Sequence, residues 1–190
     1  MRGIAILIAA MLAAAAPFGF ARADDIEVRD IALRSVDEGL ALDVDFAFEL
    51  TPRLVEVVAN GVPLYFRVDF ELTRSRWYWF DETAVSRRLQ LRLSYHALSR
   101  QYRLSAGGAL QQSFPTLEEA LDVLKRVRNW LVVERSVRLA DADYEAAVRM
   151  RLDTAMLPKP FQLSALTGRD LQLESAWKKF IVRAPQRKAR

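Results

Sequence analysis

Apolar and polar residues alternate along much of this chain, the pattern expected of strands that bury one face. The clearest run covers residues 40–50, where every second residue is apolar and the intervening ones are alanines or acids. Residues 26–33 alternate as well, but their phase slips at Arg29-Asp30, where we predict a β-bulge. Because Asp37-Glu38-Gly39 has turn chemistry and separates the two runs, we predict that they form a hairpin.

Two segments carry helix signals. Thr51-Pro52 combines an N-cap residue with a proline at the first helical position, and Asn60-Gly61 supplies a stop signal, so a short helix is predicted between them. Thr116 and Glu119 form a capping-box pattern, and the apolar residues that follow recur at helical spacing. The sequence therefore predicts two short helices among the strands.

A second hairpin is predicted from the alternation of residues 66–72 and 89–95. Pairing Leu72 with Leu91 keeps the apolar residues of both strands on one face and puts Glu71 opposite Arg92 on the other. This register centres the turn on Asp81-Glu82. A one-residue slip would bury the charged side chains, which favours the register with Leu72 opposite Leu91.

Further strands are predicted towards the C-terminus. Residues 101–106 alternate, and Gly107-Gly108 turns the chain into a short strand that runs through Phe114. Residues 131–139 and 144–152 are predicted to pair across an Ala140–Asp143 loop, although the second segment also has apolar residues at helical spacing.

The last part of the chain contains two closely spaced prolines. Residues 157–160, Leu-Pro-Lys-Pro, are expected to be extended, because each proline disfavours the helical region in the residue before it. A final strand is expected within residues 171–182.

About eight hairpin-connected strands and two short helices indicate a mainly β (α+β) fold. We expect an antiparallel β-sandwich, immunoglobulin-like or a partly closed barrel. Residues 24–183 are long enough for one domain with its own core, and residues 184–190 form a basic tail that we expect to be disordered.

The N-terminal segment has the layout of a secretory signal peptide. Arg2 is followed by an apolar run over residues 4–16, and Ala21-Arg22-Ala23 provides the small residues of an A-x-A cleavage site. The apolar run is shorter than the roughly 20 residues that a membrane-spanning helix needs. We therefore predict export to the periplasm with cleavage after Ala23; the alternative is an uncleaved membrane anchor.

Charge and composition narrow the functional classes. Removal of residues 1–23 takes away two arginines and no acid, so the net charge falls from +4 to +2, and much of that excess lies in the tail. This weak excess and the predicted export argue against nucleic acid as a partner. The chain has no cysteine, which excludes thiol nucleophiles, cysteine zinc sites and thiol redox chemistry. No motif implies a cofactor or a metal.

Candidate catalytic groups are few. His96 is the only histidine, and Ser94 and Ser99 are nearby, but no G-x-S-x-G motif accompanies them. A carboxylate pair of the glycosidase type could come from two acidic strand faces. These faces carry Asp43, Asp45 and Glu49 in one strand and Asp69 and Glu71 in another. Acidic residues are common on exposed strand faces, so we do not expect an enzyme.

An aromatic segment, Arg74-Ser75-Arg76-Trp77-Tyr78-Trp79-Phe80, follows one of the strands. Strand alternation places Tyr78 and Phe80 inward and Trp77 and Trp79 outward. Two interpretations follow: either another element covers the outer pair, or the pair forms an exposed platform for a sugar, a peptide or a protein. The residues predicted for partner contact are Arg74, Arg76, Trp77 and Trp79.

Several arginines have spacings that place them together on outer strand faces. A basic face of Arg88, Arg92, Arg149 and Arg151 is predicted, with Arg87, Arg100 and Arg103 close in sequence. Such a face would suit an anionic lipid or polysaccharide. The alternative is that these arginines neutralise Asp43, Asp45, Asp69 and Glu71 across the strands.

The chain also resembles a known family over nearly all of residues 26–183. The resemblance is carried by Leu50-Thr51-Pro52, the Asn60–Leu64 turn, Arg74–Trp79, Leu93-Ser94-Tyr95 with Tyr102-Arg103-Leu104, Leu157–Phe161 and Trp177. These segments are similar to an uncharacterised family of proteobacterial exported proteins, domain of unknown function 4390. The resemblance implies a periplasmic protein with no assigned activity and no catalytic residues, often encoded beside a sensor kinase of the nitrogen-regulation type.

These observations together predict a non-catalytic interaction module in the cell envelope. The expected partner is another envelope protein, plausibly the outer part of a membrane sensor kinase. The alternatives are a binder of envelope glycan or anionic lipid through the same aromatic and arginine residues, and, less expected, a hydrolase that uses surface carboxylates.

Overall fold

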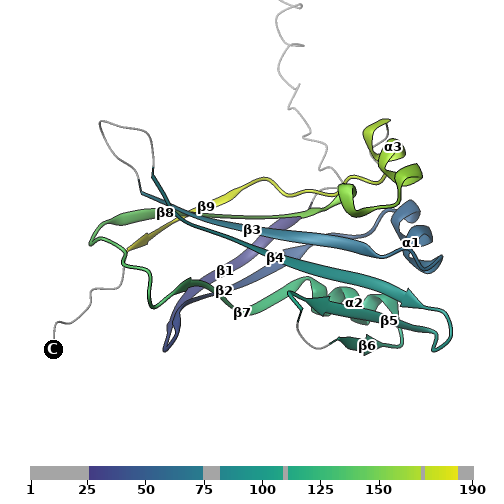
Figure 1. Ribbon diagram of the computed structural model, residues 1–190, viewed down its shortest axis with the longest axis horizontal. Helices are drawn as coiled ribbons and strands as arrows, with labels where there is room; N and C mark the ends of the chain where they lie inside the picture. Colours follow the sequence, from purple (N-terminus) through teal and green to yellow (C-terminus); the bar gives the residue numbers. More distant parts are fainter. Residues whose placement is uncertain (1–25, 75–81, 109–110, 168–169, 184–190) are drawn as a thin grey trace, which may run out of the picture.

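The computed structural model describes residues 26–74, 82–108, 111–167 and 170–183, and these form two antiparallel sheets (Figure 1). The smaller sheet has the order β1-β2-β7 and the larger one the order β6-β5-β4-β3-β8-β9. The strands are β1 (Glu27–Val36), β2 (Gly39–Ala47), β3 (Leu64–Arg74), β4 (Glu82–His96), β5 (Gln101–Ala106), β6 (Gln112–Phe114), β7 (Arg126–Glu134), β8 (Asp143–Leu152) and β9 (Lys178–Arg183). The helices are α1 (Pro52–Ala59), α2 (Leu117–Leu124), α3 (Lys159–Thr167) and the 3-10 turn η1 (Thr154–Met156).

The two sheets pack face to face, and β1 and β2 cross the strands of the larger sheet at an angle (Figure 1). Phe48, just after β2, packs on Phe66 of β3 with ring centroids 5.5 Å apart, and Phe70 meets Trp130 of β7 edge-on at 6.4 Å. The predicted mainly β, antiparallel, two-layered architecture is confirmed, and the described residues form no closed barrel.

The strand β3 lies in the middle of the larger sheet and separates its residues strictly by parity. Its even-numbered residues from Leu64 to Leu72 are fully buried between the sheets. Its odd-numbered residues, among them Arg67, Asp69 and Glu71, belong to the opposite, outer face. This alternation places the charged residues discussed below on the side of the sheet that faces away from β1, β2 and β7.

The β1–β2 hairpin has the predicted bulge, because the register shifts between Val28 and Ile31. The hairpin also depends on Gly39, whose φ of +147° is strained for other residues. A Cβ atom at this position would lie 1.9 Å from the carbonyl oxygen of Val133 in β7. Only glycine therefore allows β7 to approach the start of β2 this closely.

The helix α1 has both predicted end signals. Thr51 caps it by accepting a hydrogen bond from the Leu54 amide, and its hydroxyl donates to the Asp170 carbonyl at 2.6 Å. At the other end, the amides of Gly61 and Val62 donate to the carbonyls of Val58 and Val57, which is the Schellman arrangement. α1 lies beside α3 at one end of the molecule (Figure 1).

The predicted β3–β4 register is wrong by six residues. Leu72 lies opposite Val85, and Leu91 lies opposite Phe66, so Glu71 faces Ser86 instead of Arg92. A shift by an even number keeps every apolar residue on the same face, so alternation alone cannot distinguish the two registers. The buried apolar residues extend further than predicted, to Leu64 in β3 and to Val85 in β4. In the observed register these two additional residues are paired with apolar partners, Leu93 and Leu72.

The predicted pairing of residues 131–139 with 144–152 is also wrong. The second segment is a strand, β8, as predicted, and the helical alternative is excluded. However, β8 pairs with β3 and β9, whereas β7 pairs with β2 in the other sheet. The loop after β7 therefore crosses from one sheet to the other. Strands joined by such a loop are close in sequence but do not pair.

The region after β8 differs from the prediction in three respects. Lys159 and Pro160 begin a third helix, α3, because a proline is compatible with the first helical turn and only Leu157 keeps an extended ψ of 154°. Leu171 and Leu173 are buried outside any named strand, and the last strand is limited to Lys178–Arg183. The helix Leu117–Leu124 and its Thr116 cap are confirmed.

Some predictions fall on residues that the structure does not describe. These are the signal peptide over residues 1–23, the residues Arg76, Trp77, Tyr78, Trp79 and Phe80, and the basic tail over 184–190. In the described part of the chain, no helix has the length and apolarity required to cross a membrane.

A substitution at Gly39 tests the contact between β2 and β7. We expect Gly39→Ala to lower the free energy of unfolding by about 3 kcal/mol or more, since the new Cβ meets a backbone atom that cannot rotate away. Gly61→Ala is the matched control: its φ is +83° but nothing lies within 4 Å, so the backbone strain alone should cost about 1–2 kcal/mol. Urea denaturation of both variants measures the difference, and equal losses would contradict the close approach.

Candidate functional site

The most unusual feature of the outer sheet surface is a carboxylate surrounded by four arginines. Asp69 on β3 is 7% exposed, and the Nε atoms of Arg88 and Arg149 donate hydrogen bonds to its two oxygens, each at 3.2 Å. The Nε atoms of Arg67 and Arg151 lie 3.3 and 3.6 Å from the same carboxylate. One buried negative charge therefore contacts four guanidinium groups.

Strand register explains this convergence. Asp69 lies directly opposite Arg88 of β4 on one side and Arg149 of β8 on the other. Arg67 precedes it by two residues on the same strand, and Arg151 lies opposite Arg67. Residues two apart on a strand share a face, so three adjacent strands bring all four side chains to one point. We call the surface formed by Arg67, Arg88, Arg92, Arg149 and Arg151 the arginine face.

Two further carboxylates lie at the border of the arginine face. Nη1 of Arg67 is 3.7 Å from Asp153, and Nη1 of Arg149 is 3.8 Å from Glu174. In the described part of the chain, Arg88 and Arg151 contact no carboxylate other than that of Asp69. Four of the five arginines of the face thus contact three carboxylates, Asp69, Asp153 and Glu174, and Arg92 contacts none of them.

Two aromatic rings contact the arginine face. The guanidinium carbon of Arg149 lies 4.4 Å from the ring centroid of Trp177, and that of Arg92 lies 5.9 Å from the ring of Tyr65. Cation–π contacts of this kind hold a guanidinium in place while its N–H groups remain available. The aromatic rings therefore limit the motion of two arginines without satisfying their hydrogen-bond donors.

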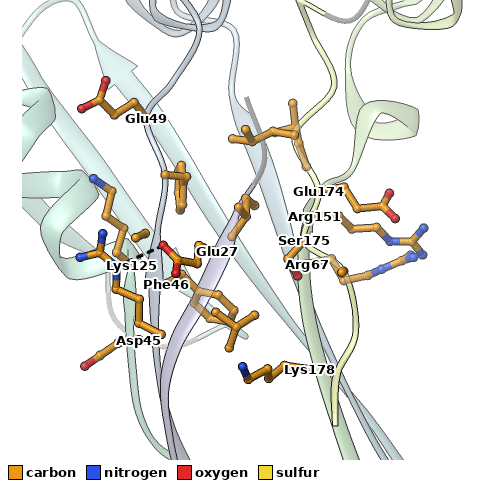
Figure 2. A pocket seen from close by; sticks show the side chains of 18 of the residues that line it. Glu27, Asp45, Phe46, Glu49, Arg67, Lys125, Arg151, Glu174, Ser175 and Lys178 are labelled. Atoms are coloured by element: carbon orange, nitrogen blue, oxygen red, sulfur yellow. Dashed lines mark hydrogen bonds and ion pairs between the residues drawn. The ribbon is translucent and has the colours of Figure 1, made fainter. Parts of the chain in front are cut away.

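A groove of about 1950 Å³ lies next to the arginine face, between the first residues of β1 and the segment 172–178 (Figure 2). Its lining includes the carboxylates Glu27, Asp45 and Glu49 and the amine of Lys125. In Figure 2 the side chains of Arg67 and Arg151 run side by side away from the groove, with Glu174 next to Arg151. The arginine face and the groove therefore open in different directions.

The structure brings together all four residues of the predicted basic face, Arg88, Arg92, Arg149 and Arg151, on the outer side of β4 and β8. It separates Arg74 from them. Arg74 ends β3 and lines a small pocket of about 210 Å³ with Tyr144 and the loop residues 137–140. The other predicted contact residues, Arg76, Trp77 and Trp79, lie outside the described part of the chain.

Sequence reasoning missed the centre of this site. The prediction that arginines neutralise Asp69 across the strands is confirmed for Arg88, Arg149 and Arg151, but Asp69 was not predicted as the point where they converge. Neither Arg67 nor Trp177 was assigned to the basic face. The signal was present in the alternation itself, because Arg67 and Asp69 have the same parity in β3 and Arg149 and Arg151 have the same parity in β8. What was missing was the β3–β8 pairing, which no local pattern predicts.

The carboxylates considered for catalysis lie on two different sides of the molecule. Asp43 and Asp45 are on the smaller sheet, where Asp43 pairs with Arg34 at 2.7 Å and Asp45 pairs with Arg128. Asp69 and Glu71 are on the larger sheet, and Asp69 is surrounded by arginines. The two acidic sets therefore cannot combine into one pair, and Glu49 lines the groove away from Asp69 and Glu71.

The histidine is the last residue of β4, just before the tight turn into β5. Nδ1 of His96 accepts a hydrogen bond from the Ser99 amide at 3.3 Å and lies 3.0 Å from the Ser99 hydroxyl. In the part of the chain that the structure describes, no carboxylate contacts this pair, as a triad would require. Nor do three or more histidines or acids in these described ranges cluster as metal ligands would.

Asp43 has a structural role that the sequence did not reveal. Arg128 and Asn129 of β7 lie opposite Asp43 alone, so this strand carries a bulge, and Asn129 adopts a left-handed φ of +52°. The extra amide, that of Asn129, donates a hydrogen bond of 2.7 Å to the Asp43 carboxylate. This bond, aided by Arg34 and opposed by partial burial, lowers the pKa of Asp43 below its usual value.

The chain belongs to the family described as Domain of unknown function (DUF4390), whose model matches residues 23–181. No curated protein and no solved structure matches the chain.

The lowered pKa of Asp43 predicts a pH-dependent contribution to stability. Its carboxylate is stabilised in the folded state, so the contribution is complete above the unfolded-state pKa and is lost as the pH falls through the folded-state value. We expect Asp43→Asn to be less stable than the wild type at pH 7, and the gap to shrink as the pH falls below about 4. Denaturation midpoints measured between neutral and acid pH test this, and a gap independent of pH would refute it.

Proposed function

We propose that this protein is a non-catalytic interaction module of the cell envelope that binds its partner through the arginine face. The observation that carries this proposal is the convergence of four guanidinium groups on Asp69, with two aromatic rings beside them. Arginine, tryptophan and tyrosine are the residues most enriched among those that dominate binding energy at protein interfaces. The partner in this proposal is another envelope protein, and the outer part of a membrane sensor kinase is the candidate.

The charge balance supports a binding role for the arginine face. A structural ion-pair network needs only enough positive charge to neutralise its acids. In the described part of this face, four arginines contact three carboxylates, and Arg92 contacts an aromatic ring instead of an acid. Arg88 is also 66% exposed at its side chain, so its terminal nitrogens are accessible to a ligand. Accessible guanidinium groups beside a rigid network are suited to binding an anionic surface.

An envelope glycan or an anionic lipid is the second candidate ligand, because the same arginines would contact its charged groups. A hydrolase is the weakest proposal. Asp43, Asp45 and Asp69 are each engaged by arginines, which favours a structural role over acid–base work.

Export is the first part of the proposal to test. We expect the chain isolated from the envelope fraction to begin at Asp24, and Ala23→Arg to block processing by placing a bulky charge at the cleavage site. N-terminal sequencing and cell fractionation give the answer. Unprocessed wild-type protein in the cytosol would contradict the proposed location in the cell envelope.

In-cell crosslinking tests the arginine face itself. A photoreactive residue at Gln90, exposed between Arg88 and Arg92, should form a protein adduct in the envelope. The same residue at Ala32, exposed on β1 of the other sheet, is the control and should not. Arg88→Glu with Arg92→Glu should reduce the Gln90 adduct about tenfold, because reversed charges repel an acidic partner.

The nature of the adduct decides between the candidates. A protein adduct that depends on both arginines supports the proposal, and a glycan or lipid adduct supports the second candidate. Adducts of equal strength at Gln90 and Ala32, or an adduct that survives charge reversal, would mean that the arginine face is not the contact surface.

A further inference from the structure

The geometry of the arginine face indicates more about its ligand than the positive charge of the face does. All four arginines around Asp69 contact it through Nε, the inner nitrogen of the guanidinium fork. Arg67 and Arg149 use a terminal nitrogen for Asp153 and Glu174, respectively. Arg88 and Arg151 differ from them, because in the described part of the chain these two contact no carboxylate other than that of Asp69.

A guanidinium whose Nε is occupied still presents a pair of N–H donors in a fixed plane. Such a pair matches the two oxygens of a carboxylate. Asp69 accepts a hydrogen bond from Arg88 and forms an ion pair with Arg151 at 3.6 Å, so both side chains lose less entropy when a ligand binds them than free side chains would. Arg88 and Arg151 lie on either side of β3, so one extended chain lying across the sheet can place a carboxylate on each.

The acids among the arginines discriminate between types of anionic ligand. Asp153 and Glu174 lie at the border of the arginine face, and Glu71 and Glu145 lie on the same outer side of β3 and β8, further along the strands. A uniformly anionic surface, such as a bilayer, would be repelled by these four carboxylates. A peptide can avoid that repulsion, because it places negative charge only opposite the arginines.

We propose that the arginine face binds an acidic peptide segment of the partner, whose carboxylates bind the terminal nitrogens of Arg88 and Arg151. Asp69 is the positioning residue of this site, because it orients both guanidinium groups without contacting the ligand. Trp177 and Tyr65 border the site and offer apolar surface to the neighbouring side chains of the segment. This inference rests on the proposed function and names the chemistry of its partner.

The test uses the full-length chain and a fluorescent peptide rich in glutamate, compared with the same peptide carrying glutamine at every glutamate position. Fluorescence anisotropy should show binding about tenfold tighter for the glutamate peptide, and the difference should decrease with salt. The double variant Arg88→Gln with Arg151→Gln should bind the glutamate peptide about tenfold more weakly than the wild type. Arg29→Gln with Arg126→Gln, exposed on the smaller sheet, makes the same change in net charge and should leave binding unchanged.

A second pair of variants separates fork geometry from charge and from folding. Arg88→Lys keeps the charge but loses the two-nitrogen fork, so its affinity should lie between the wild type and Arg88→Gln. Both changes are at a side chain that is 66% exposed, so both variants should keep the wild-type melting temperature. Arg88→Lys binding as tightly as the wild type would contradict recognition by a fork.

Other outcomes overturn the inference in distinguishable ways. Equal binding of the two peptides, or an equal loss in the Arg29 and Arg126 control, would show non-specific attraction. Tighter binding to vesicles of anionic phospholipid or to inorganic phosphate would exclude the peptide but leave the arginine face as a binding surface. Tighter binding to the vesicles would favour the second candidate ligand, an anionic lipid, over a protein partner. Absence of a Gln90 adduct in the wild type would instead show that the arginine face is not a contact surface at all.

Discussion

The alternation of β3 is the constraint on which both the core and the candidate site depend. Its even-numbered residues from Leu64 to Leu72 are completely buried, and Phe66 and Phe70 contact Phe48 and Trp130 of the other layer. A central strand with this much buried apolar surface cannot slip by one residue without exposing the core. The outward position of Arg67 and Asp69 is therefore determined by hydrophobic packing on the opposite face, and it needs no contribution from the charges.

The charges on the outer face are arranged so that burial of Asp69 is tolerable. A buried carboxylate without partners would be costly, and four guanidinium groups around Asp69 provide more compensation than one negative charge requires. The arginines keep water contact through their outer atoms, which limits the cost of bringing four positive charges together. The excess is a consequence of function in our proposal, since a single arginine pair would satisfy Asp69.

Local features were predictable from the sequence, and distant pairings were not. The cap at Thr51, the stop at Gly61 and the β1 bulge each depend on a few neighbouring residues, and all are present. The prediction of the β3–β4 register failed because Leu91 and Val85 are both odd-numbered, so pairing Leu72 with either one keeps the same residues on the buried face. The predicted pairing of β8 with β7 failed because β7 belongs to the other sheet. The basic face was predictable as a set of residues, but its centre, Asp69, depends on both pairings.

The arginine face is, in our proposal, an open binding surface on a sheet, although a groove lies next to it. The groove opens away from Arg67 and Arg151, so the ligand proposed here is not enclosed (Figure 2). An open sheet surface gains affinity from rigidity, because preformed groups lose little freedom on binding. Here the rigidity comes from the three paired strands and from Asp69, and the selectivity comes from the acids that surround the arginines. Positive charge alone would attract any anion, whereas alternating charge on a rigid sheet favours a partner with a matching pattern.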